Sequence, residues 1–303
     1  MTTTTTGRAT GRTPLTERLR RPATTRSLRL GDTKVTYVPD GAVELSGRGW
    51  FPRSTDADWA AHPQYLDDRG NLTAGIGALL VERGDRALLI DTGFGPQSLP
   101  AQPGSPRGAI HGGALLDNLA ALGRPPATIE AVAITHLHLD HIGWAWHPAP
   151  DSATPAFAGR DLLVAEAEWA HRHTLAARGV TDDILRTIAP QVRTVVDGEE
   201  VFPGVHVLLT DGHTAGHASY VITGGGERLI AFGDAMHSPI QVDHPDWSAA
   251  ADLDPDRAAH ERRRLVTELA RPGTIGFGVH FADVVFGRVR LDGEGPAWRA
   301  VLD

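Results

Sequence analysis

The sequence predicts an α/β protein in which two sheets are covered by helices, folded as one domain over residues 28–303. Two observations predict this class: the strand-like runs fall into two batches along the chain, and helical segments follow each batch. Since a sheet must bury its apolar face against another element, two helix-covered sheets are the natural arrangement. The composition agrees, because 41% hydrophobic and 22% charged residues are typical of a globular protein.

Local signals place the individual elements: alternation for strands, Gly and Pro for turns, and a 3.6-residue spacing for helices. The first batch comprises a strand at 28–38, a hairpin of 78–82 and 86–91, a Pro- and Gly-rich loop at 95–113, a helix at 114–122 and a buried strand at 131–135. The second batch comprises strands at 205–210, 218–223, 228–232 and 274–279, with predicted helices at 161–178 and 254–271. Asp254 can cap the latter helix and Pro272 can stop it.

Charge is distributed unevenly along the chain. The net charge is −8, from 29 basic and 37 acidic residues, but residues 1–30 carry seven arginines against Glu17 alone. The remaining residues therefore sum to −14 (−8 minus +6), which argues against a nucleic-acid partner. The Thr- and Arg-rich residues 1–27 predict a disordered tail. No run approaches the roughly 18 apolar residues of a membrane span, so the expectation is a cytoplasmic protein with no membrane association.

The chain has no cysteine and 15 histidines, so any transition metal must be held by histidine and carboxylate. Directly after the predicted strand at 131–135, the sequence HLHLDHIG presents His136, His138, Asp140 and His141. Side chains two apart in an extended chain point the same way, so His136 and His138 can bind one ion. A turn toward Gly143 would let Asp140 and His141 face a second ion. These ligand types suit zinc, iron or manganese.

The HxHxDH pattern resembles the signature of the metallo-β-lactamase-fold hydrolases, and this resemblance implies a four-layer αββα sandwich. Further stretches resemble the family's other motifs in order: LIDTG at 89–93, DGHTAGHAS at 211–219, GDA at 233–235, and His280 after the last predicted strand. By this resemblance, His136, His138 and His217 hold one metal, Asp140, His141 and His280 hold the other, and Asp234 bridges them. Asp91 and His213 would support the ligands from behind.

The resemblance implies two divalent ions, with zinc ahead of iron or manganese. Such ions can share a hydroxide that attacks the substrate. Asp140 would orient this hydroxide and pass a proton to the leaving group.

Two departures from related groups narrow the expected substrate. Asp234 stands where the antibiotic-degrading lactamases of this fold often use cysteine, and Trp144 stands where glyoxalase-II-like thioesterases have a second glycine. The remaining resemblance is to lactonases and to organophosphate hydrolases similar to methyl parathion hydrolase, which VPDG at 38–41 and VFPGV at 201–205 also resemble.

Aromatic residues near the metal motif suggest the walls of a substrate pocket. Trp50, Phe51, Trp144 and His237 are predicted to line an apolar pocket above the metals, although tryptophans more often fill the core.

The first hypothesis is a dinuclear metal hydrolase acting on a small apolar ester-like substrate: a lactone, a carboxylic ester or a phosphotriester. The second keeps the metal site in a biosynthetic thioesterase, cyclase or lyase, and the third is an inactive metal-binding relative. Because family members often pair through N-terminal segments, a homodimer is a further expectation.

Overall fold

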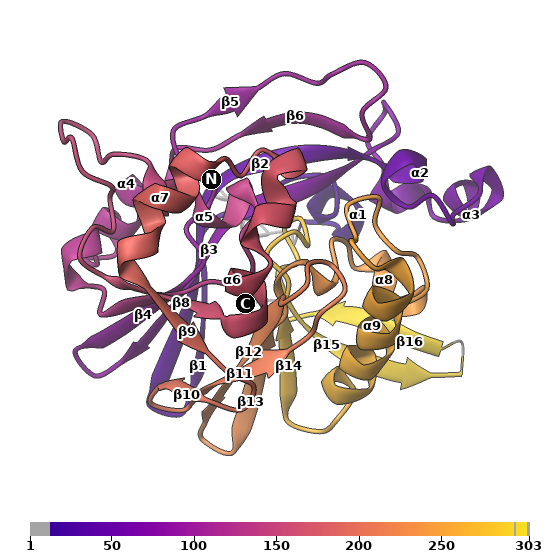
Figure 1. The fold of residues 1–303 in the computed structure, drawn as a ribbon. Helices are drawn as coiled ribbons and strands as arrows, with labels where there is room; N and C mark the ends of the chain where they lie inside the picture. The colour runs from indigo at the N-terminus through magenta and orange to yellow at the C-terminus, as the bar shows by residue number, and fades with distance from the viewer. Residues whose placement is uncertain (1–12, 294, 302–303) are drawn as a thin grey trace, which may run out of the picture.

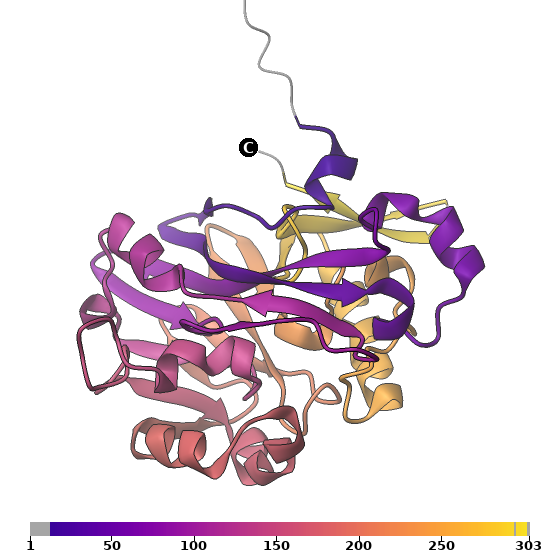
Figure 2. The same ribbon diagram turned by 90° about the horizontal axis from the view of Figure 1, so that it is seen from above.

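Two β-sheets pack face to face, and helices cover their outer faces (Figures 1 and 2). The computed structural model describes residues 13–293 and 295–301. The arrangement confirms the predicted four-layer αββα sandwich, and its strands and helices alternate as expected from the two batches in the sequence.

The first sheet comes from the N-terminal part of the chain. Its strand order is β5-β6-β2-β3-β4-β7-β8-β9, and β1 pairs with β2. The strands are β1 (Arg26–Leu30), β2 (Thr33–Ser46), β3 (Asn71–Arg83), β4 (Arg86–Ile90), β5 (Ser98–Leu99), β6 (Arg107–His111), β7 (Ala131–Ala133), β8 (Asp161–Ala165) and β9 (Val192–Val195).

The second sheet comes from the C-terminal part and runs in sequence order from β10 to β16. Its strands are β10 (Glu200–Phe202), β11 (Val205–Leu209), β12 (Ala218–Gly224), β13 (Glu227–Ala231), β14 (Thr274–Phe277), β15 (Phe286–Asp292) and β16 (Gly295–Ala300).

Helices fill the connections. They are α1 (Leu15–Arg18), α2 (Gly47–Trp50), α3 (Asp56–Ala61), α4 (Leu115–Ala121), α5 (Leu139–Trp146), α6 (Glu166–Ala170), α7 (Asp182–Ile188), α8 (Ile240–Asp243) and α9 (Pro255–Leu269). Short 3-10 helices span Pro63–Tyr65, Pro126–Thr128, Arg172–Arg178, Ala189–Gln191 and Gly233–Ala235. α4, α5 and α7 cover the first sheet, and α8 and α9 cover the second (Figure 1). Among the described helices, none combines the length and hydrophobicity needed to cross a membrane.

Alternation along the strands divides the core into layers. In β3, Leu79 and Val81 pack between the two sheets, whereas Ala78 and Leu80 face the helices on the outer side. Because each fully buried Leu or Val contributes about 1.5–3 kcal/mol, the two faces of this strand hold three layers together. This two-sided burial explains why β3 reads as an apolar run.

Three predicted segments were wrong. The strand at 28–38 is a hairpin, because β1 ends at Leu30 and β2 begins at Thr33. The loop at 95–113 contains β5, at the edge of the first sheet, and β6 beside it, and the helix at 161–178 begins as β8. In β8, Leu162 packs under the helices and Leu163 packs between the sheets. A strand buried on both faces lacks the polar alternation that would separate it from a helix.

The N-terminal segment is ordered from residue 13, which corrects part of the predicted tail; residues 1–12 lie outside the described residues. α1 is followed by Leu19, which is 6% exposed. Arg21 Nη2 and Arg26 Nη2 lie 2.8 Å and 2.9 Å from the buried carboxylate of Asp283, and Arg18 Nε lies 3.3 Å away. Three of the arginines that predicted disorder thus pair with a carboxylate near the opposite end of the chain.

Strand direction brings the candidate ligands to one edge of the sandwich. β4 and β7 run parallel in the first sheet, and β13 and β14 run parallel in the second. The carboxyl ends of parallel strands meet at the same edge of a sheet. The segments that follow these four strands therefore converge.

Candidate metal centre

The loop between β7 and α5 is fixed by Asp91, which directly follows β4. The Thr135 N–H donates to Asp91 Oδ1 at 2.8 Å, and the Asp91 Oδ2 atom lies 2.8 Å from Nδ1 of His141. Asp91 has a φ of 65°, a conformation that Asp tolerates better than most residues. Gly143 lets α5 approach closely, because a Cβ there would lie 2.1 Å from the carbonyl carbon of Phe94. The loop is thereby held with its histidines turned inward.

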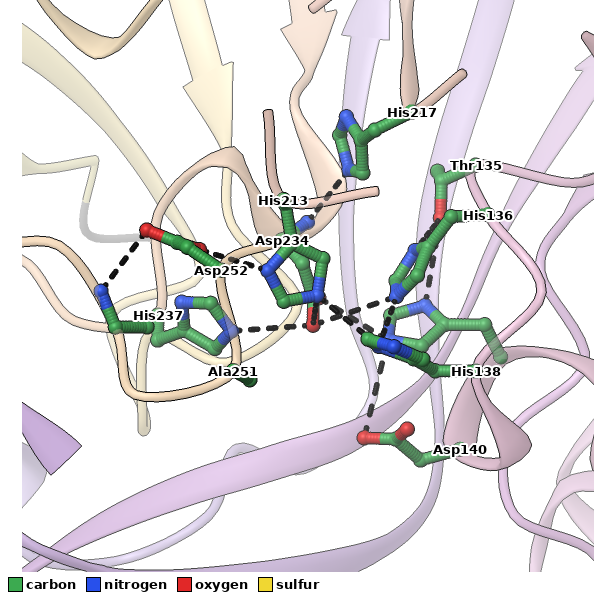
Figure 3. Close-up of polar contacts among 12 residues, drawn as sticks. Thr135, His136, His138, Asp140, His213, His217, Asp234, His237, Ala251 and Asp252 are labelled. Atoms are coloured by element: carbon green, nitrogen blue, oxygen red, sulfur yellow. Dashed lines mark hydrogen bonds and ion pairs between the residues drawn. The ribbon is translucent and has the colours of Figure 1, made fainter. Parts of the chain in front are cut away.

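Three histidines and one oxygen of Asp234 form the first group of candidate ligands (Figure 3). His138 Nδ1 lies 2.9 Å from His136 Nε2 and 3.0 Å from His213 Nε2. Asp234 Oδ2 lies 3.3 Å from His213 Nε2 and 3.6 Å from His136 Nε2. Such a cluster of imidazoles and a carboxylate without thiolate suits zinc and similar divalent ions.

The second group uses the other oxygen of Asp234. Asp234 Oδ1 lies 3.0 Å from His141 Nε2 and 2.9 Å from His280 Nε2. Asp140 Oδ2 lies 3.8 Å from both of these ring nitrogens. The two oxygens of Asp234 therefore face different groups, an arrangement compatible with the bridging role that the resemblance implies.

The third histidine of the first group is His213, not His217, and this corrects the predicted ligand set. His217 directly precedes β12, and both of its ring nitrogens have other partners. Its Nδ1 lies 2.9 Å from Thr210 Oγ1, and its Nε2 accepts the backbone N–H of Asp234 at 3.0 Å. His217 therefore supports the backbone of Asp234, while His213, in the loop before it, reaches the cluster (Figure 3).

Carboxylates and a carbonyl orient the ligand histidines from behind. Asp252 Oδ1 lies 2.9 Å from Nδ1 of His213, and the carbonyl of Gly75 accepts from Nδ1 of His280 at 2.7 Å. Together with the contact of Asp91 to His141, these partners fix which ring nitrogen faces the cluster. In metalloenzymes such outer partners are commonly needed for full metal affinity.

Burial and acidic neighbours set the protonation states of the cluster. Burial lowers the pKa of His136 well below its usual value and lowers the pKa of His217 to about 3. For His213, hydrogen bonds to Asp234 and Asp252 outweigh the effect of burial and raise its pKa to about 9. Burial would raise the pKa of Asp234, but the neighbouring histidines hold it well below its usual range. Asp234 is therefore an anion, as a metal ligand must be.

A cavity of about 500 Å³ opens onto the cluster. The cluster side includes His138, Asp140, His213, Asp234, His237 and His280. Apolar walls come from Val43, Leu45, Trp50, Phe94, Leu99, Ile110 and Leu139, and further polar lining comes from Gln102, Ser105, Arg107 and Arg178. The volume and the mixed lining are those of a small-molecule site.

Trp50 and His237 line this cavity. Their rings meet edge to face at 5.3 Å, and Nε2 of His237 lies 3.2 Å from Asp234 Oδ2. His237 also stacks on His280, with ring centroids 5.5 Å apart. The two residues therefore stand beside the candidate metal ligands.

Phe51 and Trp144 do not line the cavity, which corrects their predicted role. Phe51 is buried and packs on Trp59 and Trp247. Trp144 is buried under the first sheet, and its Nε1 donates to Asp40 Oδ1 at 3.0 Å. Both are core residues, the more common fate of large aromatic side chains.

Unpartnered polar atoms show that the residues fit a metal centre. In the described part of the chain, His141 Nε2 and Asp234 Oδ1 are buried and make no well-directed hydrogen bond, although they lie 3.0 Å apart, and Nδ1 of His237 is buried without a partner. Leaving a buried polar group unsatisfied costs about 1–3 kcal/mol. Cations held by the two groups would satisfy the atoms of His141 and Asp234.

The sequence gives no indication of two supporting carboxylates, those of Glu168 and Asp252. Glu168 accepts the N–H of Leu137 at 3.0 Å and the N–H of Gly216 at 2.9 Å, so it ties the two ligand loops together. Both carboxylates lie in segments that read as ordinary acidic surface, and no local pattern marks them as buried. Only the packing of distant segments identifies them.

A helix-covered pair of sheets with His and Asp ligands at one edge defines a class of metal-dependent hydrolases. A sequence model of the metallo-beta-lactamase superfamily matches residues 77–277. The chain belongs to this superfamily.

Among curated proteins, the chain is similar to a probable metallo-hydrolase of Mycobacterium tuberculosis, with 28% identity over 177 residues. The match covers 52% of this chain and 56% of that protein, so the chain spans only about half the length of this relative. An N-acyl homoserine lactonase of Bacillus thuringiensis is 26% identical over 214 residues, covering 66% of this chain and 79% of the lactonase.

Solved structures share the fold. AidC, a dizinc quorum-quenching lactonase, superposes with a TM-score of 0.77 at 23% identity, covering 92% of this chain and 98% of its own. The hydrolase AbOPH of the beta-lactamase superfamily superposes with a TM-score of 0.76 at 24% identity, covering 94% of this chain and 99% of its own.

Proposed function

We propose that this protein is a dinuclear metal-dependent hydrolase acting on a small, uncharged ester-like substrate, with lactones as the favoured class. The observation that carries this proposal is the pair of candidate ligand groups on either side of Asp234, beside a cavity with apolar walls and a polar floor at the cluster. The similarity to N-acyl homoserine lactonases favours lactones over other esters.

The proposed metal ions are two divalent cations, zinc ahead of iron or manganese. His136, His138, His213 and Asp234 would hold one, and Asp140, His141 and His280 would hold the other. Asp234 Oδ1 would join the second group, because it lies within 3.0 Å of His141 Nε2 and His280 Nε2. When bound, such a pair supplies Lewis acidity, which polarises an ester carbonyl and lowers the pKa of water.

Asp140 is proposed to move the proton. Its side chain is 22% exposed, against 5% for Asp234, and it lines the cavity. Asp140 Oδ2 can accept the proton that water releases as it attacks the carbonyl carbon. The same oxygen can then return the proton to the departing alkoxide, the general acid–base role of a positioned carboxylate.

His237 and Trp50 are proposed to orient the substrate. The Nδ1 atom of His237 and the Nε1 atom of Trp50 are buried and have no hydrogen-bond partner in the described part of the chain, while Nε2 of His237 lies 3.2 Å from Asp234 Oδ2. Both side chains line the cavity, so they can donate to a carbonyl oxygen of the substrate. The apolar walls formed by residues such as Val43 and Leu139 would take a hydrocarbon substituent.

Metal content and turnover test the proposal together. Metal analysis of the purified protein should find two equivalents, and a panel of lactones, aryl esters and phosphotriesters should show turnover strongest for lactones. His136→Ala should abolish turnover and release metal. Protein that binds no metal would refute the proposal, and metal-loaded protein inactive on the entire panel would redirect it to a thioesterase, cyclase or lyase reaction.

Asp140→Asn separates proton transfer from folding. The expected result is a loss of kcat of about 10²–10⁴-fold, the usual contribution of general acid–base catalysis, with an unchanged circular dichroism spectrum. Arg48→Lys, on an exposed side chain that pairs with Asp56, is the matched control and should retain full turnover.

A further inference from the structure

Arg262 of α9 is a buried cation that the function proposed above does not use. Its side chain is fully buried. Its Nε donates to the carbonyl of Pro245 at 2.8 Å, and its Nη2 donates to Ser248 Oγ at 2.7 Å. Its Nη1 donates to Asp252 Oδ2 at 3.1 Å and to the carbonyl of Ala235 at 3.3 Å. The guanidinium thus joins α9 to the segment after α8 and to the residue next to Asp234.

Asp252 connects this guanidinium to the cluster. One carboxylate oxygen faces Arg262, and the other lies 2.9 Å from Nδ1 of His213 (Figure 3). The carboxylate is itself fully buried, and its Oδ2 also accepts the N–H of Ala249 at 2.9 Å. Both oxygens of the Asp252 carboxylate are therefore held by hydrogen bonds, and these bonds fix the direction from which the carboxylate faces His213.

The energetics favour a fixed geometry for this chain of contacts. A buried charge is expensive unless it is paired and hydrogen-bonded, and here the guanidinium and the carboxylate neutralise each other. Because an Arg fork presents its donors in a rigid plane, Arg262 allows Asp252 little rotation. His213 must then keep Nδ1 toward Asp252 and Nε2 toward His138 and Asp234.

The other ligand histidines do not depend on this chain of contacts. His280 is oriented by the carbonyl of Gly75, and His141 by Asp91. Neither partner contacts Arg262 among the interactions of the described residues. Arg262 also donates to the carbonyl of Ala235, next to the shared Asp234, but at 3.3 Å this is the longest of its contacts. The influence of Arg262 should therefore fall mainly on the ligand group that contains His213.

We propose that Arg262, acting through Asp252, is a positioning residue for the metal held by His136, His138 and His213. This inference rests on the proposed metal-dependent function. It predicts that the two metal sites respond differently to the same substitution on α9.

Arg262→Lys keeps the charge and most of the volume but replaces the planar fork by a single ammonium. Outer partners of metal ligands typically contribute 10–100-fold to affinity, so one zinc equivalent should bind 10–100-fold more weakly and the other within threefold of wild type. Arg263→Lys is the matched control, because Arg263 is exposed on the same helix and pairs with Asp246. The control should bind both equivalents as the wild type does.

Single-ligand variants assign the effect to a site. His280→Ala weakens the second group and isolates the first, whereas His213→Ala isolates the second. Zinc affinity is measured by chelator competition, and cobalt(II) absorption reports the ligand geometry. Arg262→Lys should cost 10–100-fold in the His280→Ala background and less than threefold in the His213→Ala background. Equal losses in both backgrounds, or none in either, would overturn the inference.

Controls keep the outcomes distinct. Wild-type protein that binds no metal would refute the proposed function, whereas two tightly bound ions in both wild type and Arg262→Lys would refute only the role of Arg262. If Arg262→Lys does not fold by circular dichroism, Asp252→Asn replaces it, with the same site-specific loss expected. If neither variant folds, the ion pair of Arg262 and Asp252 is required for folding alone, and the positioning role of Arg262 is rejected.

Discussion

His213 replaces His217 in the candidate ligand set, so alanine variants of these two histidines should differ in metal content and in stability. His213→Ala removes a nitrogen that lies 3.0 Å from His138 Nδ1 and 3.3 Å from Asp234 Oδ2. His217→Ala removes a side chain whose nitrogens are both occupied, by Thr210 and by the backbone of Asp234. The two alanine variants lie four residues apart in one loop, yet they should fail in different ways.

The magnitudes follow from these contacts. Outer partners of ligands already contribute 10–100-fold to metal affinity. Removal of His213, a proposed direct ligand, should therefore weaken zinc binding by more than about 100-fold, or roughly 2.7 kcal/mol. His217→Ala leaves the backbone N–H of Asp234 without its partner, whereas the Thr210 hydroxyl keeps its contact with Ser219. The unpaired N–H costs this variant about 1–3 kcal/mol of unfolding free energy. At roughly 2–4 °C per kcal/mol in larger domains, its Tm should fall while zinc remains bound.

Metal analysis after dialysis against a weak chelator, combined with urea unfolding, distinguishes the two variants. His213→Ala should retain one zinc equivalent and lose nearly all lactone turnover. His217→Ala should retain two equivalents and unfold at a lower urea concentration. The opposite pattern, with zinc lost from His217→Ala and kept by His213→Ala, would refute the corrected ligand set.

The remaining predictions concern the cavity, an ion cluster and metal removal. Trp50→Ala should raise KM for a hydrophobic lactone severalfold with little change in metal content. Trp144→Ala should instead lower the free energy of unfolding in urea by about 3–5 kcal/mol, because it empties a core site. A Trp144→Ala variant as stable as the wild type would contradict the place of Trp144 in the core. Burial would raise the pKa of Asp283, but its arginine partners outweigh this and hold it below the usual value, so its stabilisation is present above about pH 4 and is lost as the pH falls through the lowered pKa. Asp283→Asn should therefore lower stability by about 1–3 kcal/mol at pH 7, and urea curves at decreasing pH should show the difference shrink below about pH 4; a constant difference would rule out the charged contacts. Removing metal with a chelator should lower Tm reversibly. The loss should correspond to about 2.7 kcal/mol of stability for each site at which free zinc exceeds Kd 100-fold. A Tm unaffected by chelation would show that the ligand groups bind no ion in the folded state.

The sequence marks the candidate ligands and supporting residues that lie close behind strands. Asp91 directly follows β4, and the candidate ligands His136, Asp234 and His280 each stand three residues after a strand. Strand ends at one edge of a sheet converge. His213 and His217 could not be separated in this way, because both lie in the connection between β11 and β12. Which one faces the cluster depends on the pairing of the strands, not on local pattern.

Strands buried on both faces are the elements that the sequence distinguishes least well from helices. Residues 161–165 read as the start of a helix because Leu162, Leu163 and Val164 form a continuous apolar run, and only their packing between two layers makes them β8. The prediction that Phe51 lines the cavity was wrong for a related reason. Phe51 is adjacent to Trp50 in sequence, but it points into the core while Trp50 lines the cavity.

The contact of Arg18 with Asp283 spans 265 positions along the chain, and His280 lies only three residues before Asp283. During synthesis, the last candidate ligand and the carboxylate that anchors the N-terminal segment thus emerge together, long after the segment they anchor. Contacts this distant form slowly, because the entropy of closing a long loop must be overcome first. The candidate ligand set therefore becomes complete only when segments from opposite ends of the described chain have come together.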